Sequence, residues 1–270
     1  MTELFQYDFM INALLAGLLA SIATGIIGSF VVVRKLGYIA GGISHSAYGG
    51  IGIAFLIGMN PILGALIFSL LAALIITYFR TSNRSNEDML ISILWSTGFA
   101  IGTLFISLSD SYTPNLMSFL FGNILTIPIT EIYIALVLDL IIIALVFVFF
   151  KKLEVVSFDE EYAKVLGINT IGYNALLFSL VAVTSVLLIK IVGIILVIAL
   201  LTIPSSISLG FSKNLKKMIF SSIAIGLVFT LLGLLISYYL NLPSGSIIII
   251  CAVLGYLIYL GIDRLRGATN

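Results

Sequence analysis

The sequence predicts an all-α membrane protein, a polytopic bundle of about nine transmembrane helices, within limits of roughly eight and ten. Of its 270 residues, 61% are hydrophobic and only 9% are charged, and the mean hydropathy is +1.24. A soluble domain of this size has too little interior to bury so much apolar surface. Most Lys and Arg residues lie in short stretches between long apolar runs, as the loops of a membrane bundle require.

Each expected helix is an apolar run long enough to cross a hydrocarbon core about 30 Å thick. The runs lie near 9–33, 39–58, 60–79, 90–108, 131–150, 170–189, 191–209, 218–240 and 245–262. The stretch 170–209 is apolar throughout and would form a helix about 60 Å long, so it must turn back. We expect the turn at 190–193, and without it the count is eight. The whole chain, 1–270, is read as a single transmembrane domain.

A shorter apolar segment, 112–130, is interrupted by Pro114, Gly122, Asn123 and Pro128. It is too short between these breaks to span a bilayer. We expect an outward-facing or re-entrant half-helix lying against the bundle, because irregular backbone at membrane depth must be covered by protein. A plain extracellular loop is the alternative.

The basic residues set the expected orientation. Five stretches hold all of them except Lys190: 34–35, 80–84, 151–164, 213–217 and 264–266. Basic residues in short loops stay on the cytoplasmic side, and all five stretches can lie there together. The N-terminus is then outside and the C-terminus inside a cell membrane. The net charge of +1 and the lack of a charged tail give no reason to expect a nucleic-acid partner.

The second expected span contains the only histidine of the chain, His45, together with many glycines. Gly41 precedes His45 by one turn, and Gly49 and Gly52 follow it on the same helical face. Helices in a membrane associate through close backbone approach, so this span should lie inside the bundle. An ionisable residue at this depth is a candidate for a transport path. The alternative is a neutral histidine that hydrogen-bonds a neighbouring helix.

Asp139 is the other ionisable residue deep in an expected span. It could be a cation ligand, a partner of Lys190, or a group facing a water-filled vestibule. One histidine and one cysteine cannot complete a closed four-ligand zinc site without distant carboxylates. We therefore expect no tightly bound cofactor, although weak ligation along a path is allowed.

Motifs for catalysis are missing from the sequence, which has no phosphate-binding loop, no H-E-x-x-H and no G-x-S-x-G. Ser44 and His45 are adjacent on a helix and point about 100° apart, so they do not form a catalytic pair. We expect a protein that is not an enzyme. If it works against a gradient, another subunit must supply the energy.

Two segments on the expected cytoplasmic side have features of docking sites. Ser157 and Glu160 match a capping box, and Gly167 suits the stop of a short amphipathic helix that carries Tyr162. The second segment begins at Pro204, which can end or kink a span. It continues through Ser205, Ser206, Lys213, Lys216 and Lys217. Ordinary interfacial helices and positive loops are the alternative for both segments.

Five stretches in this order resemble the permease subunit of zinc, manganese and iron ABC importers. They are GSFVVVRKLGYIAGGISHSAYGG at 28–50, NEDMLISILWSTGFAIG at 86–102, FLFGNILT at 119–126, FDEEYAKVLGI at 158–168 and VGIILVIALLTIPSS at 192–206. The resemblance covers nearly the whole chain. It implies an all-helical permease that forms a homodimer in the lipid membrane and is driven by a cytoplasmic ATP-binding cassette ATPase, which binds the ATP. It also implies an extracellular or periplasmic metal-binding protein.

The same resemblance implies roles for the segments described above. Pro204 to Lys217 corresponds to the helix that couples the permease to the ATPase, and the 158–167 helix is a second cytoplasmic support. Two other functions remain as alternatives. A stand-alone secondary transporter or channel would need its own coupling charges, for which Asp139 and Lys190 are the candidates, and an intramembrane enzyme would need an acid–base or metal cluster.

The chain departs from the family pattern at Gly41, where the family commonly has an aspartate that acts together with the histidine. His45 can be carried over as a residue of the metal path, but the carboxylate cannot, unless Asp139 replaces it. Imidazole without a neighbouring carboxylate suits zinc or ferrous iron better than manganese. The sequence does not identify the transported metal.

Overall fold

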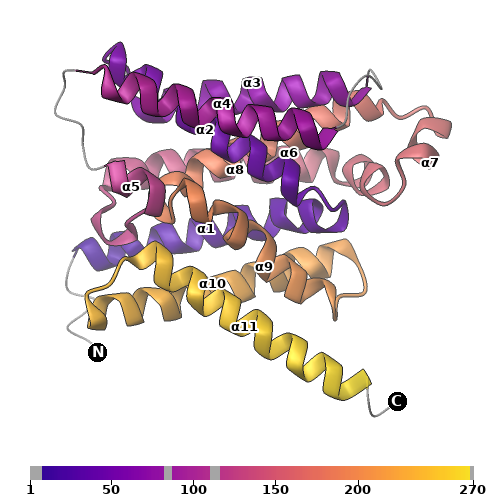
Figure 1. Cartoon of the computed structure of the whole chain (residues 1–270). Helices are drawn as coiled ribbons and strands as arrows, with labels where there is room; N and C mark the ends of the chain where they lie inside the picture. The colour runs from indigo at the N-terminus through magenta and orange to yellow at the C-terminus, as the bar shows by residue number, and fades with distance from the viewer. Residues whose placement is uncertain (1–7, 82–86, 110–115, 268–270) are drawn as a thin grey trace.

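The computed structural model describes residues 8–81, 87–109 and 116–267, and these residues form a bundle of helices without strands (Figure 1). Eight helices within them are long and apolar enough to cross a membrane. They are α1 (Asp8–Val33), α2 (Gly37–Leu56), α3 (Pro61–Thr81), α4 (Glu87–Ser107), α6 (Ile129–Phe158), α8 (Thr170–Ile191), α10 (Leu215–Leu240) and α11 (Ser244–Gly267). The short elements are α5 (Leu116–Phe121), η2 (Ile124–Thr126), α7 (Glu160–Val165), η3 (Ile194–Leu196) and α9 (Val197–Leu209).

The turn expected at 190–193 is confirmed, but the segment after it, expected as a continuous span over 191–209, is interrupted and shorter than predicted. The chain breaks at Gly193, which has φ 84°, and continues as η3 and the 13-residue α9. A Cβ at position 193 would lie 2.3 Å from the carbonyl oxygen of Leu120, so α5 occupies the space where a side chain would be. Glycine is therefore required by both the backbone conformation and the close approach.

The half-helix predicted in 112–130 is confirmed in the part that the structure describes, whereas Pro114 lies outside it. Helix α5 ends at Phe121, the next residue Gly122 has φ 67°, and Asn123 caps η2 through its side chain. Phe119 and Ile124 are buried, and α5 packs on η3 and α8. The segment lies against the bundle and is not a plain loop.

Ion pairs and a hydrogen bond show which helix ends lie together at each end of the bundle. At one end, Lys190 pairs with Glu131 and the backbone N–H of Ile124 donates to Ser244 Oγ at 3.0 Å. At the other, which we call the basic end, Arg34 and Arg80 both meet Glu160. Figure 1 shows α5 at the left end of the bundle, with α7 and the C-terminus at the right. The short η3 and α9 carry the chain from one end to the other.

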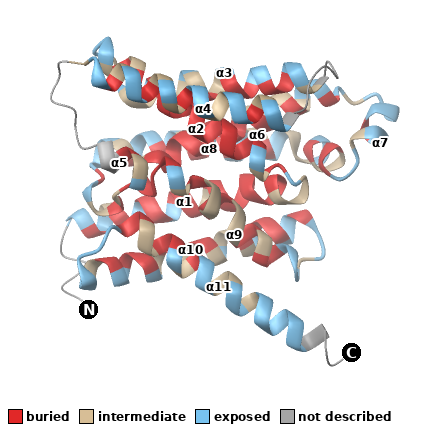
Figure 2. Ribbon diagram, in the orientation of Figure 1, coloured by how far each residue is buried: buried red, intermediate tan, exposed pale blue. Residues whose placement is uncertain are grey.

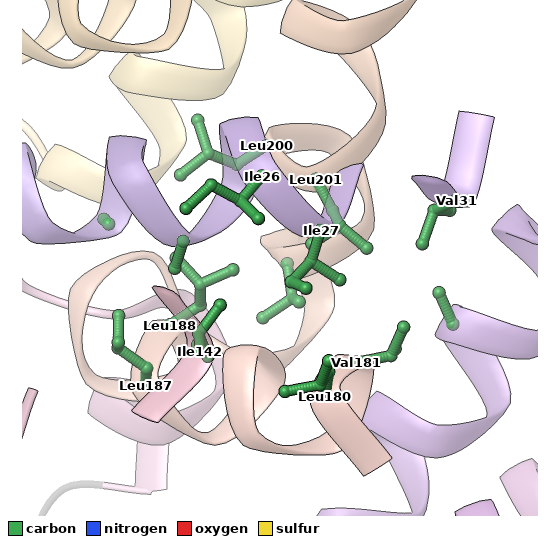
Figure 3. Packing of buried hydrophobic residues seen from close by; sticks show 14 of the residues in the cluster. Ile26, Ile27, Val31, Ile142, Leu180, Val181, Leu187, Leu188, Leu200 and Leu201 are labelled. Atoms are coloured by element: carbon green, nitrogen blue, oxygen red, sulfur yellow. The ribbon is translucent and has the colours of Figure 1, made fainter. Parts of the chain in front are cut away.

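The core lies around α1, α8 and α9, and Figure 3 shows how side chains from these helices and from α6 pack on one another. The labelled residues are Ile26, Ile27, Val31, Ile142, Leu180, Val181, Leu187, Leu188, Leu200 and Leu201. Helices α2 and α8 are mostly buried, whereas α11 is mostly exposed (Figure 2). The exposed apolar helices can face lipid, and the glycine-rich α2 is interior, as its sequence predicts.

Candidate functional site

His45 lies on α2 about 12 Å from the start of that helix, and its side chain is only 4% exposed. Its ring stacks on Trp95 of α4, with the centroids 4.0 Å apart and the planes 14° apart. Phe99, one turn further along α4, lies 5.2 Å from the same ring. Among the described residues, the buried Nδ1 of His45 has no hydrogen-bond partner. The site thus offers one nitrogen donor in an aromatic enclosure.

Trp95 is the residue that the sequence analysis missed. It is the only tryptophan of the chain and lies within the NEDMLISILWSTGFAIG stretch. Gly41 lies beside the same enclosure, since a Cβ there would be 2.9 Å from Ile198 Cδ1 and 3.2 Å from Trp95. A stacked tryptophan shields the imidazole from water, and it must move for an ion to reach the ring from the α4 side.

The glycines that follow His45 are packed against α4. A Cβ at Gly49 would lie 3.1 Å from the carbonyl oxygen of Gly98, and one at Gly52 would lie 2.5 Å from that of Gly102. Helix α4 therefore fills this glycine face beyond His45, and Gly49 and Gly52 leave no open path to the imidazole within one protomer. The glycines allow α2 and α4 to approach closely, which is a packing role.

Asp139 faces a different interface. Its carboxylate is 2% exposed on α6, a helix that packs on α1 and α8, whereas α2 packs on α3, α4 and α8. Neither carboxylate oxygen has a hydrogen-bond partner among the described residues. No group of three or more His, Cys, Asp or Glu that could hold a metal ion occurs in the described part of the chain. The structure therefore does not place Asp139 beside His45.

The suggested pairing of Asp139 with Lys190 is wrong. Lys190 Nζ lies 3.2 Å from Glu131 at the N-terminal end of α6. The same ammonium lies 4.6 Å from the centroid of the Phe119 ring on α5. Lys190 thus joins α8, α6 and the half-helix at the end opposite the basic end.

A second polar cluster lies at the basic end. Glu160 pairs with Arg34 at 3.0 Å and lies 3.8 Å from Arg80. Arg34 also donates to Asn174 at 2.7 Å, and Asn174 donates to Glu160 at 3.2 Å. Burial lowers the pKa of Arg34, as does the nearby Arg80, while Glu160 acts in the opposite direction. We call these four residues the Glu160 cluster, and it fixes α7 to the ends of α1, α3 and α8.

The capping box predicted from Ser157 to Glu160 is wrong, because α6 continues through Phe158 and Ser157 is buried in its last turn. Asp159 caps α7 instead, accepting from the backbone N–H of Tyr162 at 2.8 Å. Gly167 ends the turn with φ 72°, as predicted. Exposed apolar side chains remain on this short helix and beside it, and they belong to Phe158, Tyr162, Val165 and Leu166.

The segment 204–217 is not one helix. Pro204 and Ser205 are buried in α9, and Ser206 is half-buried. Ser208 Oγ donates to the carbonyl oxygen of Met218 at 2.9 Å, so the ends of α9 and α10 are held together. The exposed part comprises the turn after Leu209 and the side chains of Lys213, Lys216 and Lys217. The expected docking surface is therefore shorter than predicted, and Pro204 and Ser205 lie beneath it.

Comparisons with known proteins are consistent with this geometry. The model of the ABC 3 transport family matches residues 6–262. An uncharacterized membrane protein of Synechocystis sp. is 39% identical, over 98% of this chain and 94% of its own. The manganese import system permease protein ScaB of Streptococcus gordonii is 33% identical, over 94% and 91%. The solved PsaBC from Streptococcus pneumoniae, in complex with Fab, superimposes with a TM-score of 0.86 and 35% identity, over 95% and 92%.

Proposed function

Because the chain belongs to the ABC 3 transport family and is a metal ABC importer permease, we propose that it forms the path for a divalent metal ion, with manganese as the first candidate. A separate ATP-binding cassette ATPase drives it, and an extracellular metal-binding protein delivers the ion. The functional unit contains two copies of the permease. The observation that supports the proposed path is the buried position of His45 on the glycine-rich α2, where its ring stacks on Trp95 of α4.

His45 is suited to transient contact with a metal in transit. Its imidazole lies well within the membrane, and one of its ring nitrogens is unpartnered among the described residues. A single nitrogen donor binds a divalent ion weakly, and conduction needs sites that release as well as bind. The aromatic cover closes the site in this conformation. An opening step must separate Trp95 from His45, or must expose the imidazole on another side.

Two arguments about the identity of the transported metal point in opposite directions. A relative of this chain is named as a manganese permease, which favours manganese. The glycine at position 41 removes a possible carboxylate beside His45, and imidazole alone favours zinc or ferrous iron. We give manganese priority, because the binding protein, rather than a single transient ligand, selects the ion in this proposal. Competition among radiolabelled manganese, zinc and iron during uptake distinguishes the candidates.

The basic end is proposed to face the cytoplasm, with the N-terminus outside and the C-terminus inside. Support comes from the clustering of Arg34, Arg80 and Lys216 at one end of the bundle. The exposed turn that follows Leu209 and the exposed apolar side chains around α7 lie at that end and are the proposed ATPase contacts. Acidic or neutral residues occupy the opposite loops, except for the paired Lys190.

Cysteine labelling of intact cells tests this orientation in a Cys251→Ser background, which removes the only native thiol. An impermeant maleimide should label Leu242→Cys from outside and should label Lys213→Cys only after the membrane is opened. Both native side chains are exposed, so access through the protein is not limiting. Labelling of Lys213→Cys in intact cells would contradict the orientation.

Reconstitution tests whether the permease needs a separate ATPase to accumulate metal. Proteoliposomes that contain the permease, its ATPase and the binding protein should accumulate metal only when ATP is supplied. The permease alone should not accumulate metal. Full uptake by the permease alone would support the stand-alone transporter and would contradict the proposal.

A further inference from the structure

A groove of about 880 Å³ opens between the basic-end halves of α6 and α10, with α1 as its floor. Its apolar lining consists of Ile22, Ile26, Ile143, Val146, Phe147, Val148, Phe149, Phe150, Ile219, Phe220 and Ile223. The two most exposed aromatic walls are Phe147, 83% exposed, and Phe220, 74% exposed. Such side chains are stable in this position only if hydrocarbon or another apolar surface covers them.

Helix length places the groove at one membrane boundary. Helix α6 begins at Ile129, and Lys151 lies 22 residues later, which corresponds to about 33 Å along the axis. That distance matches the thickness of the hydrocarbon core, about 30 Å. The apolar walls from Ile143 to Phe150 therefore lie within one leaflet, and Lys151 lies at the level of the headgroups.

Three lysines form the rim of the groove: Lys151, Lys152 and Lys216. Lys216 Nζ lies 5.4 Å from the centroid of the Phe150 ring, so α10 and α6 contribute to the same rim. Lys152 Nζ lies 5.8 Å from the ring of Tyr173 on α8. Among the described residues, none of the three lysines forms an ion pair with a carboxylate. The rim thus presents three positive charges that the described protein groups do not neutralise.

We propose that this groove binds an anionic phospholipid of the leaflet at the basic end. The acyl chains lie along the aromatic walls, and the headgroup phosphate lies among the three lysines. The apolar walls match the acyl chains, and the cationic rim matches the phosphate. The assignment of that leaflet to the cytoplasm rests on the proposed orientation, but the lipid site itself does not.

Charge favours the lipid over a second copy of the chain. A symmetric contact through this groove would bring the three lysines of one copy close to the same lysines of the other, and like charges at close range repel. A zwitterionic lipid could fill the apolar walls but would leave the rim with no net compensating charge. An anionic lipid satisfies both parts of the groove, and basic residues at a membrane surface attract such lipids.

A fluorescent reporter tests the site directly. Phe220→Trp in a Trp95→Phe background places the only tryptophan in the groove. Brominated phosphatidylglycerol should quench it more strongly than brominated phosphatidylcholine at equal mole fraction. Adding Lys152→Gln and Lys216→Gln should lower the relative association constant for the anionic lipid by roughly fivefold per lysine.

The matched control is the pair Lys213→Gln and Lys217→Gln, which removes the same amount of charge from the same end of the bundle but does not line the groove. This pair should leave the anionic preference unchanged. Equal quenching by the two lipids, or an equal loss of preference in the control, would overturn the proposal. The proposal would also be overturned if neither brominated lipid quenched the tryptophan and two copies of a Phe147→Cys variant formed a disulfide. A second copy of the chain would then cover the groove.

Native mass spectrometry of the unsubstituted permease gives an independent readout that does not depend on the variants folding. After purification from mixed lipid, the protein should retain phosphatidylglycerol in preference to phosphatidylcholine. Retention of the two lipids in proportion to their supply would also overturn the proposal.

Discussion

Glu160→Gln should lower the stability of the folded protein much more than the same change at the next residue. The Arg34 side chain is 6% exposed, and Glu160 neutralises it at 3.0 Å. An amide keeps the shape and can accept hydrogen bonds, but it leaves Arg34 without its counter-charge and beside Arg80. Removing one partner of a buried ion pair costs about 3–5 kcal/mol. Since Glu160 is partly exposed, we expect about 2–3 kcal/mol here.

The adjacent Glu161 supplies the control, because its side chain is 93% exposed and its ion pair is the surface contact with Lys164 at 3.6 Å. Glu161→Gln should change stability by less than about 1 kcal/mol. Thermal unfolding of the purified permease should therefore show a drop in Tm of about 5–10 °C for Glu160→Gln and almost none for Glu161→Gln. Adding Arg34→Met to Glu160→Gln should recover part of the loss. Equal Tm values for the two glutamate variants would refute the role of the Glu160 cluster.

Three further predictions follow from the packing and the site. Gly50→Ala should lower the Tm or prevent assembly, because its Cβ would lie 2.0 Å from the carbonyl oxygen of Gly64 on α3, whereas Gly261→Ala, with open space around it, should not. Gly41→Asp should fold, because the new Cβ meets only side chains, the flexible tip of Ile198 at 2.9 Å and the Trp95 ring at 3.2 Å, and small shifts of both make room for it. It should shift uptake toward manganese over zinc, and unchanged competition between the metals would contradict this. Ser206→Trp should reduce metal uptake per ATP hydrolysed while the ATPase continues to work, and normal coupling would count against this docking surface.

Much of the fold follows from hydropathy and charge. The eight long helices and the single basic end could be predicted because apolar length and loop charge act locally. The position of the break at Gly193 could be predicted, but the short length of the helix that follows it could not. A run of uniform hydrophobicity does not show that Leu120 occupies the adjacent space, and this contact between distant segments ends the helix.

The sites were less predictable because they depend on contacts between helices. His45 could be identified from its depth and type, yet its stacking on Trp95 requires knowing that α2 packs on α4. Likewise, Ser157 and Asp159 both begin acceptable caps, and the choice depends on how far α6 extends. Asp139 shows the limit most clearly, because its sequence position gave no indication that α6 and α2 pack on different neighbours.

Uptake by a His45→Asn variant tests the central claim most directly. An amide can keep a neutral hydrogen bond but is a much poorer ligand than imidazole for a transition metal. In proteoliposomes that contain the complete transporter, ATP should drive accumulation of radiolabelled manganese by the unsubstituted permease. The variant should assemble and allow basal ATP hydrolysis, but it should accumulate no metal. Uptake by His45→Asn at the unsubstituted rate would remove His45 from the metal path.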